Sequence, residues 1–262
     1  MGINLHHDAG IQAVMSDHGR MHAQRDEAHL PAHPPRRVTS FRARHSALSD
    51  AQQRTWDQRW PELGTQARTD AGEPKGVLDI EAWFGRSAPL VLEIGSGAGI
   101  STFAMAVAEP DLDVIAVEVY RRGLGQLLSA VDREGLTNVR FIRGDGIDVL
   151  EHMLTSDSLT GVRVFFPDPW PKARHHKRRL LQAPVFALIA DRLRVGGVLH
   201  AATDHADYAE QIGEVGDAEP RLRRVSAADT LPMSVERPTT KFEEKGLRAG
   251  STINEFLWVK LR

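Results

Sequence analysis

Acidic residues stand at four places where an apolar run of the sequence ends. They are Glu93, Glu118, Asp145 and Asp168. Ionised carboxylates repel phosphate but attract cations and accept hydrogen bonds, so such a set suits a positively charged ligand. A carboxylate can also stabilise positive charge that develops on a substrate during a reaction. We expect Asp168 at the reacting centre, with a cofactor pocket before it in the chain and a nucleic-acid surface after it.

A glycine-rich segment directly follows Glu93. Its glycines, Gly95, Gly97 and Gly99, alternate, unlike the G-x-G-x-x-G spacing of dinucleotide-binding proteins. Alternating glycines let the backbone approach a ligand closely. Glu118 is placed to accept both hydroxyls of a ribose, and Asp145 to accept an adenine amino group. The pattern favours the cation S-adenosylmethionine over NAD, and a glycine-rich turn with capping acids is the structural alternative.

The turn around Asp168 follows an apolar run, Val162–Phe166, and has a proline on each side of the acid. Proline fixes φ and has no N–H group, so the strand must stop and the chain must turn. Open α/β sheets bind ligands at the carboxyl ends of their strands, which is where this turn is expected. A turn-forming role alone remains the structural alternative for Asp168.

A tryptophan and a basic run follow the turn. Trp170 looks exposed in the sequence and could stack on an RNA base, although core packing is equally compatible with it. The run Lys172–Arg179 could neutralise phosphates, and affinity from such contacts falls with salt. A solvated helix face is the usual alternative, but the position directly after the turn favours contact with RNA.

The composition is that of an ordinary globular protein. The chain has 262 residues, 41% of them hydrophobic, a net charge of −2 and no cysteine, which excludes disulfides, thiolate nucleophiles and cysteine-ligated metals. No apolar run approaches the roughly 18 residues that span a membrane, and no signal peptide is evident, so we expect a cytoplasmic protein. We expect no metal site, and leave open whether the protein is a monomer or a homodimer.

The chain divides into an arm and one domain. Residues 1–37 hold six of the twelve histidines, several prolines and no periodicity, and are predicted to be a disordered arm rather than a metal site. The domain is predicted over 38–262. It begins with a basic lead-in, then a helix capped by Ser49 that passes Trp56 and Trp60 and ends at Pro61.

Strands and helices alternate through the rest of the domain. The predicted strands are Leu90–Ile94, Val114–Val117, Val139–Ile142, Val162–Phe166 and Val198–Ala202, with Leu222–Val225 and Phe256–Val259 as a closing antiparallel pair. A helix is predicted over Leu180–Leu193, closed by Gly196 and Gly197, and another passes through Tyr208. The fold class is therefore α/β, a Rossmann-like, mostly parallel seven-stranded sheet with helices on both faces.

These residues resemble a specific family, the bacterial tRNA (guanine-N7-)-methyltransferases, which are class I methyltransferases. The resemblance runs from about Val38 to the C-terminus. It rests on the segments Val91–Gly97, Val117–Arg121 with Gly123 and Gly125, Phe165–Arg179, Ala202–Asp204 and Arg237–Glu243. It implies transfer of a methyl group from S-adenosylmethionine to N7 of a guanine in the variable loop of tRNA.

The resemblance also implies roles for individual residues. Those matching donor-binding positions are Glu93, Gly95, Gly97, Glu118, Asp145 and Asp168, which is also the expected catalytic residue. Those matching substrate contacts are Lys172, Asp204, Thr240, Lys241, Phe242 and Glu243. Those matching RNA contacts are Arg174, His175, His176, Lys177, Arg178 and Arg179. The chain departs from the family pattern at His205 and over Ser251–Asn254, which leaves local substrate contacts open.

The chemistry of guanine N7 needs little from the protein. N7 carries a lone pair and no proton, so attack on a sulfonium methyl needs no general base, and alignment supplies much of the rate. We expect Asp168 to stabilise the positive charge that the purine gains. Asp204 is expected to accept from the base edge, with helix capping as its alternative.

Two other functions remain open at this stage. One is a class I methyltransferase acting on an exocyclic amine or a small molecule. The other is an idle RNA-binding module, which the intact donor residues disfavour. A dehydrogenase is disfavoured by the glycine spacing.

Overall fold

The computed structural model describes residues 39, 41, 47–239, 243 and 252–262. All of them belong to the larger of two units of the chain, Val38–Arg262, and only this unit is described below. The predicted arm, residues 1–37, lies outside the described residues. Among the residues that the structure describes, no helix combines the length and apolar character needed to cross a membrane.

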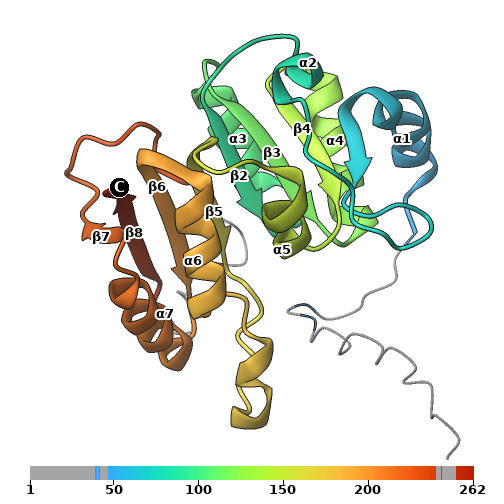
Figure 1. Ribbon diagram of the computed structural model, residues 1–262. Coiled ribbons are helices and arrows are strands. Elements are labelled where there is room, and N and C mark those ends of the chain that lie inside the picture. Colours follow the sequence, from blue (N-terminus) through green and yellow to red (C-terminus); the bar gives the residue numbers. More distant parts are fainter. Residues whose placement is uncertain (1–38, 40, 42–46, 240–242, 244–251) are drawn as a thin grey trace, which may run out of the picture. The chain divides into compact units, whose positions relative to one another are not determined.

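A single twisted sheet of eight strands runs through the domain (Figure 1). Its order is β1 (Gly64–Gln66), β4 (Val139–Arg143), β3 (Asp113–Glu118), β2 (Leu90–Ile94), β5 (Leu159–Phe165), β6 (Leu193–Thr203), β8 (Asn254–Lys260) and β7 (Leu222–Val225). The first six are mutually parallel, and β8 is antiparallel to both β6 and β7. The α/β class and the closing antiparallel pair are confirmed.

The eighth strand was not predicted. β1 is a three-residue edge strand, Gly-Thr-Gln, that pairs in parallel with β4. It carries neither alternation nor an apolar run, so its sequence gives no strand signal. The sheet therefore has one strand more than the seven expected.

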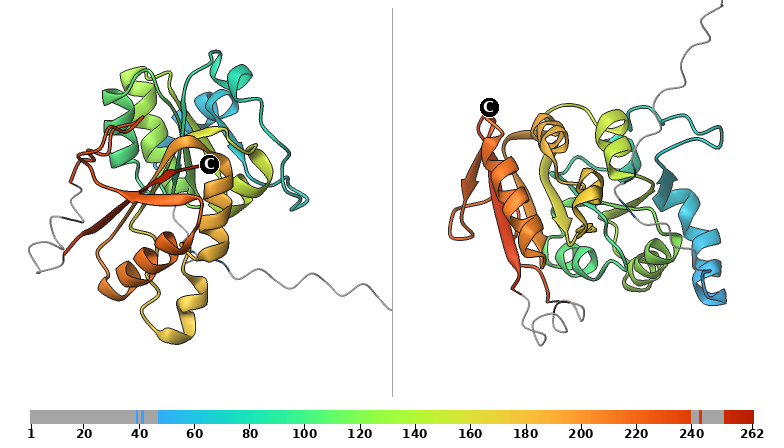
Figure 2. Two further views of the ribbon diagram at one scale, coloured as in Figure 1. Left: turned by 60° about the vertical axis from the view of Figure 1, so that its left-hand side comes forward. Right: turned by 90° about the horizontal axis from the view of Figure 1, so that it is seen from below.

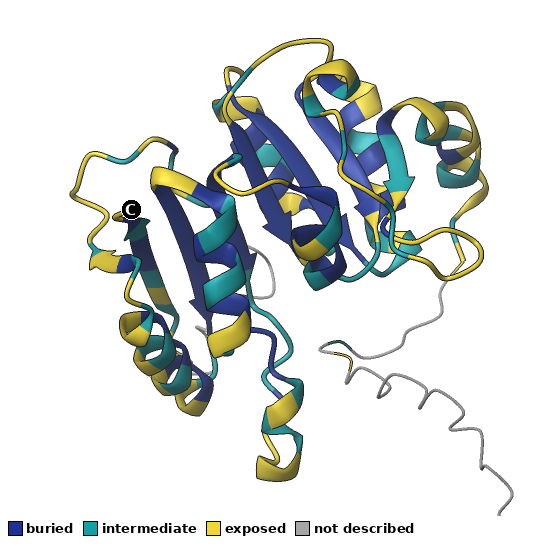
Figure 3. Ribbon diagram, in the orientation of Figure 1, coloured by how far each residue is buried: buried dark blue, intermediate teal, exposed yellow. Residues whose placement is uncertain are grey.

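Helices cover both faces of the sheet (Figure 2). They are α1 (Asp50–Leu63), α2 (Ile80–Phe84), α3 (Ile100–Ala108), α4 (Arg121–Glu134), α5 (Gly146–Asp148), the π-helical turn η1 (Val149–Met153), the 3₁₀ helix η2 (Ala173–Arg178), α6 (Ala183–Arg192) and α7 (Ala206–Ala218). Apolar side chains of α1, α3 and α4 pack on one face, and those of α2, α5, η1, α6 and α7 on the other. The central strands are consequently buried on both sides (Figure 3).

Most predicted strand positions are confirmed, with shifts at the ends. β2 matches its prediction residue for residue, because a strand buried on both faces reads as a continuous apolar run. β6 begins at Leu193 and includes Gly196 and Gly197, which were expected to close the preceding helix. α6 is correspondingly shorter than predicted and ends at Arg192.

The first helix differs at its end. Ser49 caps α1 as predicted, with a reciprocal pair of hydrogen bonds between Ser49 and Gln52. The helix does not stop at Pro61 but continues to Leu63, which is buried. Leu63 packs with Trp56, so burial of the last turn outweighs the hydrogen bond that Pro61 cannot donate.

Candidate active site

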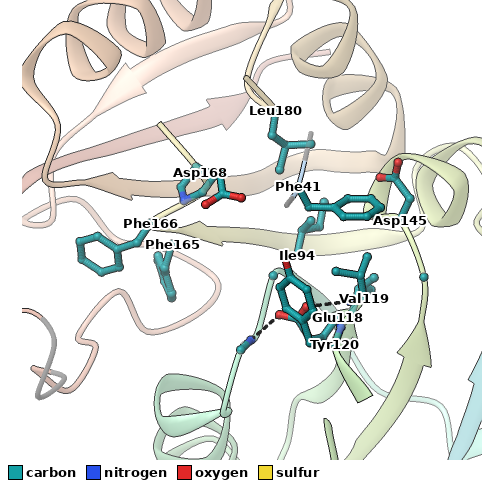
Figure 4. Close-up of a pocket in the computed structure, with 16 residues that line it drawn as sticks. Phe41, Ile94, Glu118, Val119, Tyr120, Asp145, Phe165, Phe166, Asp168 and Leu180 are labelled. Atoms are coloured by element: carbon teal, nitrogen blue, oxygen red, sulfur yellow. Dashed lines mark hydrogen bonds between the residues drawn. The ribbon is translucent and has the colours of Figure 1, made fainter. Parts of the chain in front are cut away.

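A cavity of about 260 Å³ opens at the carboxyl ends of the central parallel strands. Its walls come from the glycine loop after β2, from the ends of β3, β4 and β5, and from Phe41 and Leu180. Three acidic side chains, Glu118, Asp145 and Asp168, stand around it (Figure 4). The structure thus brings together carboxylates from three successive stretches of the sequence at one edge of the sheet.

The glycine loop has the backbone conformation that its composition suggested. Gly95, Gly97 and Gly99 have φ values of 80°, 57° and 77°, a region that other residues rarely adopt. The N–H groups of Gly95 and Ser96 both donate to Val117 O, at 2.8 and 3.1 Å. Gly95 and Gly97, which are predicted to bind the donor, line the cavity.

A further glycine lets the next helix approach this loop. A Cβ atom on Gly123 of α4 would lie 2.2 Å from Gly97 O. Any side chain at residue 123 would therefore push the helix and the loop apart. In the sequence Gly123 is part of a motif, but its packing role depends on a contact that the sequence does not show.

Glu118 connects the end of β3 to the glycine loop. One carboxylate oxygen accepts from Gly97 N at 2.8 Å, and the other accepts from Val119 N and Tyr120 N at 2.7 and 2.9 Å (Figure 4). Glu118 therefore shapes the cavity as well as lining it.

Asp145 both lines the cavity and begins a helix. Its Oδ1 accepts from Ile147 N at 3.0 Å, which caps α5. Helix capping, the structural alternative for the acidic residues, is therefore observed for Asp145.

Glu93 does not take the position expected for a donor contact. It is 3% exposed and absent from the described walls of the cavity, because Leu92 and Ile94 pack on one face of the sheet while Glu93 points to the other. It lies opposite Arg163 of β5. Burial raises the pKa of Glu93 to about 7, although Arg163 opposes the shift. Glu93 is a buried polar residue under the loop.

The turn that carries Asp168 is built on an unusual backbone. Phe166 and Trp170 have φ values of 51° and 45°, in the left-handed region that bulky residues avoid. Phe166 N donates to Ala202 O of β6 at 2.8 Å. Asp168 lies between these two residues and lines the cavity, so the turn presents the carboxylate to the site as predicted.

Trp170 is buried rather than exposed. Only 7% of its surface is accessible, and the guanidinium of Arg178 lies 3.9 Å from the centre of its ring. Core packing, the alternative left open by the sequence, therefore describes Trp170 better than a platform for a base. The stacked Arg178 also donates to Thr39 O and Thr39 Oγ1 at 3.2 Å.

The basic run forms the short helix η2 and is not uniform. Lys172, Arg174 and Lys177 are exposed, and His175 and His176 partly so. Desolvation, followed by Arg174 and the other cations of the run, lowers the pKa of His175 and disfavours its charged form. Arg179 departs from the prediction of an RNA contact, because it is 2% exposed and bonded to residues of the domain.

The predicted substrate residues lie in two places. Asp204 directly follows β6, and α7 begins from His205 at its N-cap without a side-chain hydrogen bond, so the capping alternative for Asp204 is wrong. Thr240, Lys241 and Phe242 lie outside the described residues. Glu243 is buried and pairs with Arg237.

Arg237 begins a segment that carries the family resemblance, but the sequence does not predict its contacts. Besides Glu243 it pairs with Glu255 at 2.5 Å, and its guanidinium lies 5.1 Å from the ring centre of Phe166. It therefore joins the segment before Glu243 to the turn that carries Asp168. Only its place two residues before the Thr-Thr-Lys-Phe-Glu motif could have drawn attention to it.

Fold and site together define a class of protein. The mostly parallel sheet ends in an antiparallel last strand, and a loop of alternating glycines and acidic strand ends surround one cavity. These features define a class I S-adenosylmethionine-dependent methyltransferase. The pattern of a family described as "putative methyltransferase" matches residues 87–256.

Relatives place the chain more narrowly. A tRNA (guanine-N(7)-)-methyltransferase of Mycolicibacterium gilvum (strain PYR-GCK) is 66% identical, over 93% of this chain and 98% of its own length. Another, of Mycobacterium avium (strain 104), is 58% identical over 94% of this chain and all of its own length. A solved antibiotic-resistance methyltransferase, Kmr, is 16% identical with a TM-score of 0.46, covering 70% of this chain and 92% of its own. The chain belongs to the tRNA (guanine-N(7)-)-methyltransferase family.

Proposed function

We propose that this protein transfers a methyl group from S-adenosylmethionine to N7 of a guanine in the variable loop of tRNA, in the cytoplasm where tRNA is used. The relatives carry that activity in their names, down to the guanine N7 of tRNA. The observation that carries the proposal is the position of Asp168, which lines the cavity and lies shortly before the exposed cations Lys172, Arg174 and Lys177.

The cavity suits a cationic donor. Among its described walls are three carboxylates, those of Glu118, Asp145 and Asp168, and no lysine or arginine. This charge set would repel the pyrophosphate of a dinucleotide and attract a sulfonium. The glycines at the loop allow close approach by the backbone, and the donor, when bound, supplies an electrophilic methyl group.

The residues of the chain then act by position and charge. Glu118 and Asp145 are proposed to hold the ribose and the adenine, as hydrogen-bond acceptors. Guanine N7 has no proton to lose, so no general base is required. Asp168 lowers the barrier by stabilising the charge that the purine gains. Asp204, at the end of the adjacent strand β6, accepts from the base edge.

The tRNA is proposed to contact the exposed part of the basic run. Lys172, Arg174 and Lys177 provide three cations on η2 and beside it, next to the turn that carries Asp168. Phosphate contacts orient a nucleic acid without reading its sequence, so these residues would position the tRNA rather than select the guanine. Selection is left to Asp204 and to the segment ending at Glu243.

The decisive experiment maps the product. The purified protein is incubated with unmodified tRNA and methyl-labelled donor, and the modified nucleotide is located by nuclease digestion and mass spectrometry. We expect label at N7 of one variable-loop guanine. Label on an exocyclic amine or at another site, or transfer to small molecules in preference to tRNA, would contradict the proposal.

A further inference from the structure

The last residue of the basic run faces the interior of the domain. Arg179 Nε donates to Pro169 O at 2.9 Å, and its Nη1 donates to Gln211 Oε1 at 2.7 Å. Its Nη2 forms an ion pair with Asp207. The guanidinium also lies 4.8 Å from the ring centre of Tyr208. One buried side chain thus contacts the turn after β5 and the first turns of α7.

On the side of the turn, Arg179 holds a backbone that local preferences oppose. Pro169 directly follows Asp168, and the flanking Phe166 and Trp170 both have positive φ. Ordinary residues adopt such conformations only when the surroundings hold them there. A charged donor on Pro169 O is one such restraint, one peptide unit from the Asp168 side chain.

On the side of α7, the partners belong to the segment that follows Asp204. Asp207 and Gln211 are one turn apart on the helix, and both bind the same guanidinium. A second link runs beside it, since Tyr208 Oη accepts from Leu181 N at 2.9 Å and Gln211 Nε2 donates to Leu181 O at 3.2 Å. The chain after Asp204 and the chain after Asp168 are therefore connected through Arg179 and its neighbours.

We propose that Arg179 is a positioning residue for methyl transfer, which fixes Asp168 relative to Asp204, and not an RNA contact. The inference rests on the proposed function, because those two carboxylates face the guanine there. The geometry favours this role over phosphate binding on two grounds. Arg179 is 2% exposed, and its charge already faces the carboxylate of Asp207. Arg174, at the start of the same run, is exposed to solvent.

The test compares Arg179→Gln with Arg174→Gln in the full-length chain. Three quantities are measured: the single-turnover rate per donor-binding site at saturating tRNA, the donor Kd, and the salt dependence of tRNA binding. For Arg179→Gln we expect a rate about 10- to 100-fold lower, since a displacement near 1 Å can cost that much. Its donor Kd and salt slope should remain those of the wild type. For Arg174→Gln the salt slope should fall by about 0.7–0.9, the loss of one phosphate contact.

Partner variants separate positioning from loss of stability. Asp207→Asn combined with Gln211→Ala removes the partners on α7 while leaving Arg179 in place. It should lower the rate as Arg179→Gln does, and the two sets of changes should be far from additive. Arg221→Gln serves as the stability control, because Arg221 bonds Glu219 and Ala187 O away from the cavity. It should lower the melting temperature without lowering the rate per donor site.

Each result decides the matter. A fall in the salt slope of Arg179→Gln equal to that of Arg174→Gln, with the rate retained, would make Arg179 an RNA contact. A rate loss shared with Arg221→Gln at equal destabilisation would reduce it to a structural residue. If Arg179→Gln does not fold, the double variant on α7 carries the test alone. If the wild type methylates tRNA and Arg179→Gln is equally active, this inference is refuted and the proposed function stands. If the wild type itself is inactive, both are refuted.

Discussion

The two sides of the candidate site are built in different ways. The donor side consists of glycines with positive φ and of backbone N–H groups that bind Val117 O or the Glu118 carboxylate. The acceptor side consists of a turn whose bulky residues, Phe166 and Trp170, adopt positive φ and are held by side chains from elsewhere. One side has a backbone suited to its own sequence, and the other depends on its neighbours.

The difference concerns where the conformational energy comes from. A glycine adopts positive φ at little steric cost, so the donor loop needs only short-range hydrogen bonds. Phe166 and Trp170 pay a cost there that the rest of the fold must offset. Phe166 is bonded to Ala202 O and lies under Arg237, while Trp170 is covered by Arg178. Substitutions on the donor side should therefore weaken donor binding. Substitutions on the acceptor side should lower the rate of methyl transfer or weaken tRNA binding.

The largest expected effect is that of Asp168→Ala. We expect the protein to fold and to bind the donor, and methyl transfer to tRNA to fall by about 10²-fold or more, because the charge on the purine is no longer stabilised. Single-turnover transfer from labelled donor measures the rate, and calorimetry the donor affinity. Asp111→Ala, an exposed aspartate before β3 and so at the amino ends of the strands, is the control. Normal turnover of Asp168→Ala would remove the distinction between the two sides.

A second prediction concerns Glu93, a buried acid on the donor side that is absent from the described cavity walls. Its pKa is raised to about 7 in the folded chain, against 4.5 as the unperturbed value. Between these values the folded state holds a proton that the unfolded state has lost, so stability must fall as pH rises through this window. The penalty is absent below the lower value and complete above the upper one.

Replacing the acid should remove this pH dependence. We expect the free energy of unfolding of Glu93→Gln, relative to wild type, to rise by about 3 kcal/mol from the acid side of the window to the alkaline side. Urea denaturation of the donor-free protein at a series of pH values measures it. Glu134→Gln, an exposed residue at the end of α4, is the matched control. Parallel curves for wild type and Glu93→Gln would show that Glu93 ionises normally.

The structure of the donor side was easier to predict from the sequence than that of the acceptor side, because its backbone depends on residues that are close in the sequence. β2 reads as an uninterrupted apolar run, and the glycine loop follows it directly, so both are local signals. The absence of Glu93 from the described cavity walls could not be predicted, because alternation says that neighbouring residues face opposite sides but not which side holds the cavity. That choice depends on how the strands are ordered.

On the acceptor side the errors come from side-chain contacts that the local sequence pattern does not show. Arg179 looks like Arg178 within one basic run, yet it is buried against Asp207, 28 residues further along the chain. Trp170 is covered by Arg178, a contact that follows only from the path of η2. The resemblance to a known family drew attention to this stretch, whereas the burial of Arg179 within it depends on the packing of α7.

A smaller effect on the donor side is expected from Glu118→Gln. Glu118 is the proposed acceptor for the ribose of the donor, and a hydrogen bond to a charged acceptor contributes about 1.5–3 kcal/mol. We expect the donor Kd to rise by about 10- to 100-fold, which follows from the same range. The rate at saturating donor should change much less than the Kd. Calorimetric titration checks this, and a variant that loses rate but keeps donor affinity would place Glu118 on the wrong side of the comparison.

The smallest effect should come from the exposed cations. Lys172→Gln and Lys177→Gln each remove one charge next to the turn without touching the cavity walls. Each is expected to lower the salt slope of tRNA binding by about 0.7–0.9 and to leave donor binding as it is. Arg223→Gln, an exposed arginine on the edge strand β7, carries the same charge change away from η2 and should leave the slope unaltered. If the salt slope of all three variants equals that of the wild type, tRNA approaches the cavity from another face. The basic run is then solvated, as its composition alone would suggest.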